Sequence, residues 1–182
     1  RDLTENVEQL QIKKGLEVII SRVVAALARL SALAIEHEQL AIVGRTHNVP
    51  AQITTLGKRF ASTAEELMIS YHRLNDLLNA YPLRGIKGPV GTQQDQMDLF
   101  DGDNSKVFKM EQIVAKHLGF EKVFDSVGQV YPRSLDFEVV SSLFQTASGP
   151  SSLAHTIRLM AGHELVTEGF QAGQVGSSAM PH

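Results

Sequence analysis

Apolar residues recur every three or four positions between Leu3 and about Glu38, a stretch in which no Gly or Pro follows Gly15. The stripe comprises Leu16, Ile19, Val23, Leu27, Leu30 and Ala34. This spacing places the apolar side chains on one face and predicts a single long amphipathic helix. Arg22 and Arg29 interrupt its most apolar part, and each would cost about 2.5–3.5 kcal/mol at a bilayer centre, so the pattern favours a core helix over a membrane span.

A second stripe of the same period predicts another long helix that reaches Asn79. Its apolar positions are Leu56, Phe60, Ala64, Leu67, Tyr71, Leu74 and Leu78. At a rise of 1.5 Å per residue this helix is roughly 35–40 Å long, and a helix of that length buries one face against neighbours. The stretch from Gly44 to Pro50 is expected to be a turn-rich linker, and no segment alternates regularly enough to predict a strand.

Glycine and proline divide the next part of the chain. The segment from Leu83 to Thr92 contains Gly85, Gly88, Pro89 and Gly91 and is predicted to be an ordered loop. A shorter helix is expected from Ser105 to Leu118, because Gly119 follows it as a typical helix terminator.

A third long helix is predicted after Pro132, which suits the first turn of a helix. The pattern carries it to about Phe170, with a kink at Gly149-Pro150 because proline removes a backbone donor. The tail from Gly173 to His182 is rich in Gly and Ser and is expected to be mobile. The predicted fold class is therefore all-α, a bundle of long helices.

Composition places these helices in one soluble domain. The chain has 182 residues, of which 43% are hydrophobic, enough for a single domain with its own core over residues 1–182. A net charge of −3 argues against a nucleic-acid binder. The absence of Cys and of an Asn-x-Ser/Thr sequon favours the cytoplasm. Because the chain starts at Arg1 and stops inside a Gly-Ser-rich run, we expect a domain truncated at both ends.

Common catalytic motifs are incomplete. His163-Glu164 begins like a zinc-protease helix, but Thr167 stands where the second His ligand would be, so no metal site is expected. The glycines of the Leu83 to Thr92 loop are not followed by the Gly-Lys-Ser/Thr of a phosphate-binding loop. Single His, Glu and Gly residues outside a complete motif are common in ordinary loops. Spacing alone therefore predicts a helical bundle without an assigned activity.

Two segments resemble signature motifs of the fumarase/aspartase superfamily. Residues 44–52 (GRTHNVPAQ) are similar to its Thr-His-x-x-Pro-Ala-Gln segment, and residues 176–181 (GSSAMP) to the start of its Gly-Ser-Ser-x-Met-Pro-x-Lys-x-Asn loop. Other segments resemble the adenylosuccinate lyase family in particular. These are residues 1–6 (RDLTEN), 57–59 (GKR), 84–93 (RGIKGPVGTQ), 102–103 (GD) with 106–107 (KV), and 128–133 (GQVYPR). The resemblance covers essentially the whole chain.

This resemblance implies an elimination in purine biosynthesis. Fumarate would be released from adenylosuccinate, giving AMP, and from the succinylated imidazole ribotide SAICAR, giving AICAR. In that reaction His47 is implied to be the general acid that protonates the leaving nitrogen, and Ser177 the general base that removes a proton from the succinyl β-carbon. Gln129 and Thr46 are implied to contact the substrate, and no metal or organic cofactor is implied.

The family resemblance also implies a homotetramer in which long helices form a central core and each active site takes segments from three subunits. The three site segments therefore need not converge within one chain. Because the substrate carries a phosphate and two carboxylates, cationic side chains should converge on it, and at most two or three of them should touch it. The candidates are Lys58, Arg59, Arg84, Lys87 and Arg133. The loop Lys and an upstream His motif of the family lie outside these residues, so the isolated chain is expected to be inactive.

Two alternatives stay open. The shared motifs also fit another lyase of the superfamily, such as argininosuccinate lyase, although the segments at residues 57–59, 84–93 and 128–133 favour adenylosuccinate lyase. A noncatalytic helical assembly module is a different class of function, and the presence of both His47 and Ser177 counts against it.

Overall fold

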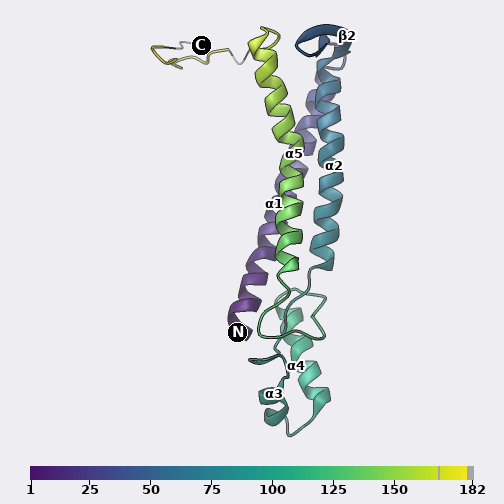
Figure 1. Ribbon diagram of the computed structural model, residues 1–182, viewed down its shortest axis with the longest axis vertical. Coiled ribbons are helices and arrows are strands. Elements are labelled where there is room, and N and C mark those ends of the chain that lie inside the picture. The colour runs from purple at the N-terminus through teal and green to yellow at the C-terminus, as the bar shows by residue number, and fades with distance from the viewer. Residues whose placement is uncertain (168, 180–182) are drawn as a thin grey trace.

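A computed structural model describes residues 1–167 and 169–179 of the chain. Its frame is a rod of long helices in which α2 packs against both α1 and α5 (Figure 1). These helices are α1 (Asp2–Glu36), α2 (Leu56–Ala80) and α5 (Ser134–Gly162). The bundle of long helices predicted from the apolar stripes is confirmed.

The core follows the seams between the three long helices. Its buried helical residues include Leu16, Val23 and Leu30 on α1, Leu67 and Leu74 on α2, and Leu135 and Val139 on α5. On α1 and α2 these positions are seven residues apart, which keeps one narrow seam facing the neighbouring helix. Those on α1 and α2 belong to the predicted stripes, so the local period identified these two core faces correctly.

The first helix begins and ends within two residues of its predicted bounds. By length and composition alone α1 could cross a membrane. Its buried stripe packs along α2, whereas most of the apolar window of α1 is not buried within the single chain.

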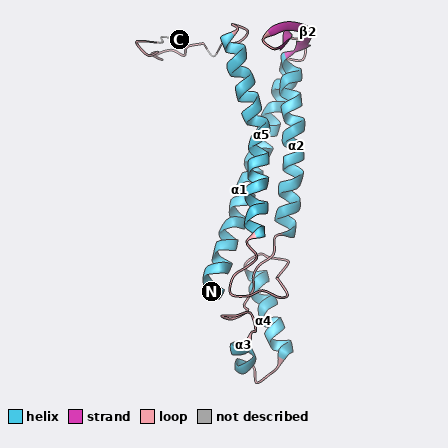
Figure 2. Cartoon of the chain, viewed as in Figure 1, coloured by secondary structure: helices cyan, strands magenta, loops and turns pink. Residues whose placement is uncertain are grey.

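A β-hairpin joins α1 to α2, which corrects the prediction of a linker without strands (Figure 2). Strands β1 (Ala41–Thr46) and β2 (Val49–Thr55) pair antiparallel. The ladder contains a bulge, in which Gly44 of β1 lies opposite two residues of β2, Ala51 and Gln52. Pro50 pairs with Arg45, a position that a two-stranded sheet tolerates because each strand has an open edge. Most residues of both strands are exposed, so the hairpin has no buried face whose alternation could have predicted it.

Two shorter helices, α3 (Gln94–Leu99) and α4 (Asn104–His117), lie beyond the N-terminal end of α1 (Figure 1). α4 matches the shorter helix predicted for this region, whereas α3 was not predicted. Asp103 caps α4 by accepting hydrogen bonds from the backbone N–H groups of Ser105 at 3.0 Å and Lys106 at 3.3 Å. The hydrogen bond from the Ser105 hydroxyl, followed by that from the Lys106 N–H, lowers the pKa of the Asp103 carboxyl.

Pro150 lies inside α5, and the helix continues through it. The C-terminal part of α5 leans away from α2 (Figure 1). This direction change is of the kind expected where a proline removes one donor from the helical hydrogen-bond series.

The end of α5 differs from the prediction. The helix stops at Gly162, well before the predicted Phe170. The backbone N–H of Leu165 donates to the carbonyl of Met160 at 2.9 Å, which is the closing bond of a Schellman motif. Glu164 occupies the left-handed position of that motif with φ of 57°. Because Gly usually fills this position, the sequence contained no conventional stop signal here.

Candidate active site

His47 lies at the tip of the β-hairpin. His47 and Asn48 are the two central turn residues, with φ values of 52° and 62°. Two left-handed residues in a two-residue loop make a type I′ turn, whose twist matches that of paired strands. The Nη1 group of Arg45 donates to the carbonyl of Asn48 at 2.8 Å and braces the turn. A histidine held in this conformation costs backbone energy, and such positions concentrate at functional sites.

The neighbouring threonine orients the imidazole ring. Thr46 Oγ1 lies 3.0 Å from Nδ1 of His47. This hydrogen bond engages one ring nitrogen, and Nε2 has no partner among the described residues. Nε2 is therefore the ring nitrogen left to meet a bound molecule.

A cavity of about 300 Å³ separates the hairpin tip from the C-terminal part of α5. We call it the hairpin cavity; its walls include Arg45, His47, Arg59, Met160 and His163. Sequence reasoning did not select His163, which it considered only as part of an incomplete zinc motif. No local signal marks this residue, because it borders the cavity only through the tertiary arrangement of the hairpin and the end of α5.

A second, larger cavity lies beside the first and shares Arg45 and Arg59 with it. We call this space of about 710 Å³ the basic cavity, because Lys58 joins the two arginines in its wall. Within the described part of the chain, none of the three cations has a carboxylate partner. Lys58 Nζ donates to the Ser62 hydroxyl at 2.9 Å, and Nε of Arg59 is buried without a hydrogen-bond partner. Glu66 also lines this cavity, so the wall carries three cationic side chains and one carboxylate, and the excess of positive charge suits an anion.

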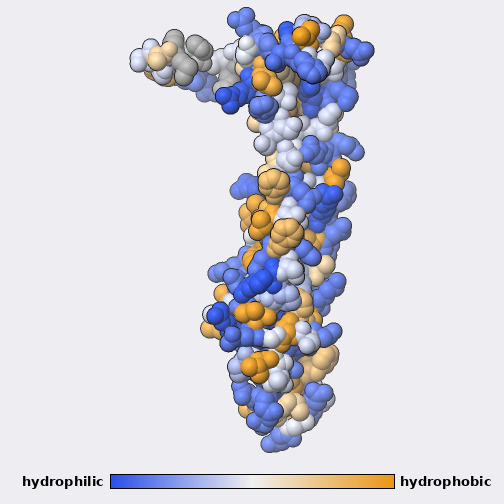
Figure 3. Space-filling model, in the orientation of Figure 1, coloured by the Kyte–Doolittle hydropathy of each residue, from blue (hydrophilic) through white to orange (hydrophobic). Residues whose placement is uncertain are grey.

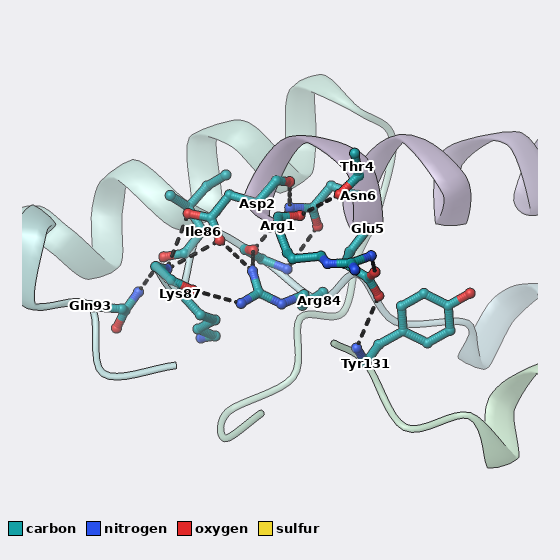
Figure 4. Close-up of polar contacts among 12 residues, drawn as sticks. Arg1, Asp2, Thr4, Glu5, Asn6, Arg84, Ile86, Lys87, Gln93 and Tyr131 are labelled. Atoms are coloured by element: carbon teal, nitrogen blue, oxygen red, sulfur yellow. Dashed lines mark hydrogen bonds and ion pairs between the residues drawn. The ribbon is translucent and has the colours of Figure 1, made fainter. Parts of the chain in front are cut away.

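The other candidate cations are engaged within the chain. Arg84 is fully buried and forms an ion pair with Asp2 (Figure 4). Lys87 is paired with buried Glu111 at 2.7 Å. Arg133 is paired with Glu5 at 3.1 Å. Of the five predicted candidates, Lys58 and Arg59 are thus the two whose charges are left for a ligand.

Gln129 lies at the opposite end of the rod. It is exposed in the loop before Tyr131, which contacts Glu5 near the N-terminus of α1, whereas His47 follows the C-terminus of α1. The 35 residues of α1 span roughly 50 Å at 1.5 Å per residue. One chain therefore does not bring Gln129 and His47 together.

Tyr131 is buried at this Gln129 end, and its hydroxyl donates to Asp136 at 2.8 Å. Burial, followed by this hydrogen bond, raises the pKa of the Tyr131 hydroxyl above its ordinary value. The phenol therefore stays protonated and is a donor rather than a base.

Ser177 lies in the irregular segment after α5, which extends away from the rod (Figure 1). Its side chain is exposed and borders a surface depression with Glu164 and Leu165, outside both cavities near His47. Leu165 also borders the hairpin cavity, so the two features adjoin. The expected mobility of residues 173–182 stays a prediction, and the last three residues of that range lie outside the described part.

A family model described as lyase matches residues 2–182. The chain is 37% identical over 179 residues to the adenylosuccinate lyase of Schistosoma mansoni and 37% identical over 180 residues to that of Saccharomyces cerevisiae. These matches cover 98% and 99% of this chain and 37% of each relative. The chain thus spans little more than a third of the length of these relatives.

Solved structures share the fold. The 3-carboxy-cis,cis-muconate lactonizing enzyme of Pseudomonas putida has a TM-score of 0.81 and 26% identity, covering 100% of this chain and 39% of that chain. A fumarate lyase from Mesorhizobium sp. BNC1 has a TM-score of 0.70 and 22% identity, covering 90% of this chain and 37% of that chain, and shows the fold alone. With the family model matching nearly every residue, the chain belongs to the lyase family of the fumarase/aspartase superfamily.

Proposed function

We propose that this chain is the central helical segment of an adenylosuccinate lyase, which eliminates fumarate from adenylosuccinate and from SAICAR in purine biosynthesis. His47 is the general acid, Ser177 is the general base, and Gln129 and Thr46 contact the substrate. The enzyme acts in the cytoplasm and uses neither a metal nor an organic cofactor. It binds a small nucleotide substrate rather than nucleic acid.

The reaction needs a base near the succinyl β-carbon and an acid near the nitrogen that leaves from the neighbouring carbon. Ser177 removes a proton from the succinyl β-carbon, and the electron pair left on that carbon forms the new double bond as the carbon–nitrogen bond breaks. His47 gives a proton to the departing nitrogen through Nε2, while the Thr46 hydroxyl holds Nδ1 at 3.0 Å. The products are fumarate and AMP.

The observation that carries this proposal is the position of His47 beside unpaired cations. The imidazole lines the hairpin cavity, and Arg45 and Arg59 connect that cavity to the basic cavity. A succinylated nucleotide carries a phosphate and two carboxylates, and charge-assisted hydrogen bonds from Arg and Lys are the usual means of binding such groups. The adenylosuccinate lyases that match nearly the whole chain support the same substrate.

The separation of the three candidate segments supports sites shared between subunits. Gln129 and His47 lie roughly 50 Å apart along one rod, so a complete site requires other copies of the chain. Exposed apolar side chains are available for such an assembly (Figure 3). On α5, Phe137, Val140 and Phe144 are 73%, 62% and 78% exposed, and their spacing of three and four residues puts them on one face. We propose that these faces meet in a homotetramer.

The direct test is an assay of the full-length protein against two substrates. Adenylosuccinate should be converted to AMP and fumarate, detected by the change in ultraviolet absorbance, whereas argininosuccinate should not react. Turnover of argininosuccinate in place of adenylosuccinate would show that the protein is instead an argininosuccinate lyase. A folded tetramer that turns over neither substrate would instead favour the noncatalytic assembly module.

A further inference from the structure

The first turns of α1 present a row of polar side chains to two loops that are distant in sequence (Figure 4). Asp2, Glu5, Asn6 and Gln9 follow the spacing of one helix face. Glu5, Asn6 and Gln9 are only 1%, 4% and 0% exposed. Burying polar groups costs free energy unless they are hydrogen-bonded. The hydrogen-bond partners of these side chains therefore show which segments the row holds in place.

Three members of the row bind the backbone of residues 84–88. The Arg84 N–H donates to Gln9 at 2.6 Å, and the Gly85 N–H donates to Asn6 at 2.9 Å. The Gly88 N–H donates to both carboxylate oxygens of Asp2 at 3.1 Å. These contacts fix the start of this loop on α1.

Arg84 and Glu5 extend the same network to the loop that carries Gln129. Arg84 Nη2 donates to the carbonyl of Gly128 at 2.9 Å, immediately before Gln129. The Tyr131 N–H donates to Glu5 at 3.4 Å, two residues after Gln129. The loops also touch directly, since a Cβ at Gly91 would lie 1.8 Å from the Val127 carbonyl oxygen.

These contacts hold the backbone on both sides of the exposed Gln129 side chain. The guanidinium of Arg84 joins the carbonyls of Gly88 and Gly128 at 2.8 and 2.9 Å while its charge is balanced by Asp2. A lysine at this position would keep the charge but lose the planar fork that reaches several acceptors at once.

We propose that Arg84 and Glu5 are positioning residues that hold Gln129 in the orientation in which it contacts the substrate. This inference rests on the substrate-contact role given to Gln129 in the proposed function. Neither Arg84 nor Glu5 is placed to touch the substrate, because both side chains are buried and, apart from Nε of Arg84, their polar atoms are bonded within the chain. Their effect on the reaction passes through the backbone on either side of Gln129.

A double-mutant cycle in the full-length protein tests the proposal. Arg84→Lys should lower kcat/KM about tenfold or more in the parent protein, because small misplacements of a contact residue are costly. In a Gln129→Ala background the same change should lower it less than about twofold, since the residue being positioned is already gone. Lys87→Arg, a charge-preserving exchange in the same loop, should act equally in both backgrounds. Equal losses from Arg84→Lys in the two backgrounds would overturn the proposal.

A measurement without turnover separates this proposal from the proposed function. Residues 1–182 contain no Cys, so Gln129→Cys introduces the only thiol of this segment. Any Cys elsewhere in the full-length protein is replaced by Ser before the nitroxide spin label is attached. Arg84→Lys should increase the mobility of that label in its electron paramagnetic resonance spectrum, whereas Lys87→Arg should not. If Arg84→Lys does not fold, the isosteric Glu5→Gln variant makes the same comparison. Unchanged label mobility in a folded variant would reject the positioning role, even if the enzyme proved to act on another substrate.

Discussion

Thr46 Oγ1 lies 3.0 Å from Nδ1 of His47 at the tip of the hairpin. Both residues are exposed, and the turn holds His47 with a left-handed backbone, so neither packing nor chain connectivity requires the hydrogen bond between them. Its consequence is chemical: with Nδ1 engaged, Nε2 is the nitrogen that can serve a ligand.

The Thr46 hydroxyl is therefore expected to assist the acid. Thr46→Val, which removes the hydroxyl at nearly constant volume, should lower kcat about fivefold to tenfold, the rate equivalent of a hydrogen bond with a net contribution of ~1 kcal/mol. Thr46→Ser keeps the hydroxyl and should retain most of the activity. Steady-state kinetics of the full-length protein measure both. A serine variant as impaired as the valine variant would show that the methyl group, not the hydroxyl, is what matters.

The roles of His47 and Ser177 separate when the leaving group is changed. Each alanine variant should lose about 10²–10⁴-fold in turnover, the usual contribution of a general acid or base. A substrate analogue whose departing nitrogen is more stable as an anion should partly rescue His47→Ala and leave Ser177→Ala unrescued. Substrate deuterated at the succinyl β-carbon probes the Ser177 step. Equal rescue of the two variants would contradict the assignment of acid and base.

Lys58 and Arg59 should contribute to substrate affinity, because their charges are left unpaired within the described part of the chain beside the basic cavity. Arg59→Gln is expected to raise KM about tenfold, since a hydrogen bond to a charged group contributes about 1.5–3 kcal/mol. Lys109→Gln removes an exposed charge on α4 and is the matched control. Equal KM values for the two variants would show that the anionic groups of the substrate bind outside the basic cavity.

The exposed apolar face of α5 should hold the subunits together. Phe144 is 78% exposed in the single chain, and Phe144→Glu would place a charge in the proposed interface. Sedimentation velocity should show the full-length tetramer dissociating, whereas Glu138→Gln, an exposed polar change on the same helix, should leave it intact. A Phe144→Glu protein that stays tetrameric at micromolar concentration would show that this face lies outside the contact.

The buried pair of Lys87 and Glu111 should matter for stability rather than catalysis. Lys87→Met leaves the Glu111 carboxylate buried without its cation and is expected to lower the free energy of unfolding by about 3–5 kcal/mol. Adding Glu111→Gln should restore part of the loss, because the Gln oxygen can still accept the Ile86 N–H, which donates to Glu111 at 3.0 Å. Chemical denaturation measures both variants. A double variant less stable than Lys87→Met would contradict this account.

The long helices and their core faces could be predicted because the information is local. Leu16, Val23 and Leu30 repeat within one helix, so the face that they define follows from helix geometry whatever the helix packs against. The His47 and Ser177 segments could be found in the same way, since each motif is contiguous in sequence. Where each helix ends was less certain: Glu164 closes α5 without the Gly that normally marks such an end.

Only the tertiary structure decided how the charges and the hairpin are used. Arg84 and Lys58 look alike in the sequence, yet Arg84 meets Asp2 across 82 residues and is buried, whereas Lys58 stays beside a cavity. His47 on the hairpin and His163 after α5 line the same cavity, although no local pattern connects them. The physical reason is that ion pairing and burial depend on which distant segments meet, and that is determined by the packing of the whole chain rather than by the period of any one helix.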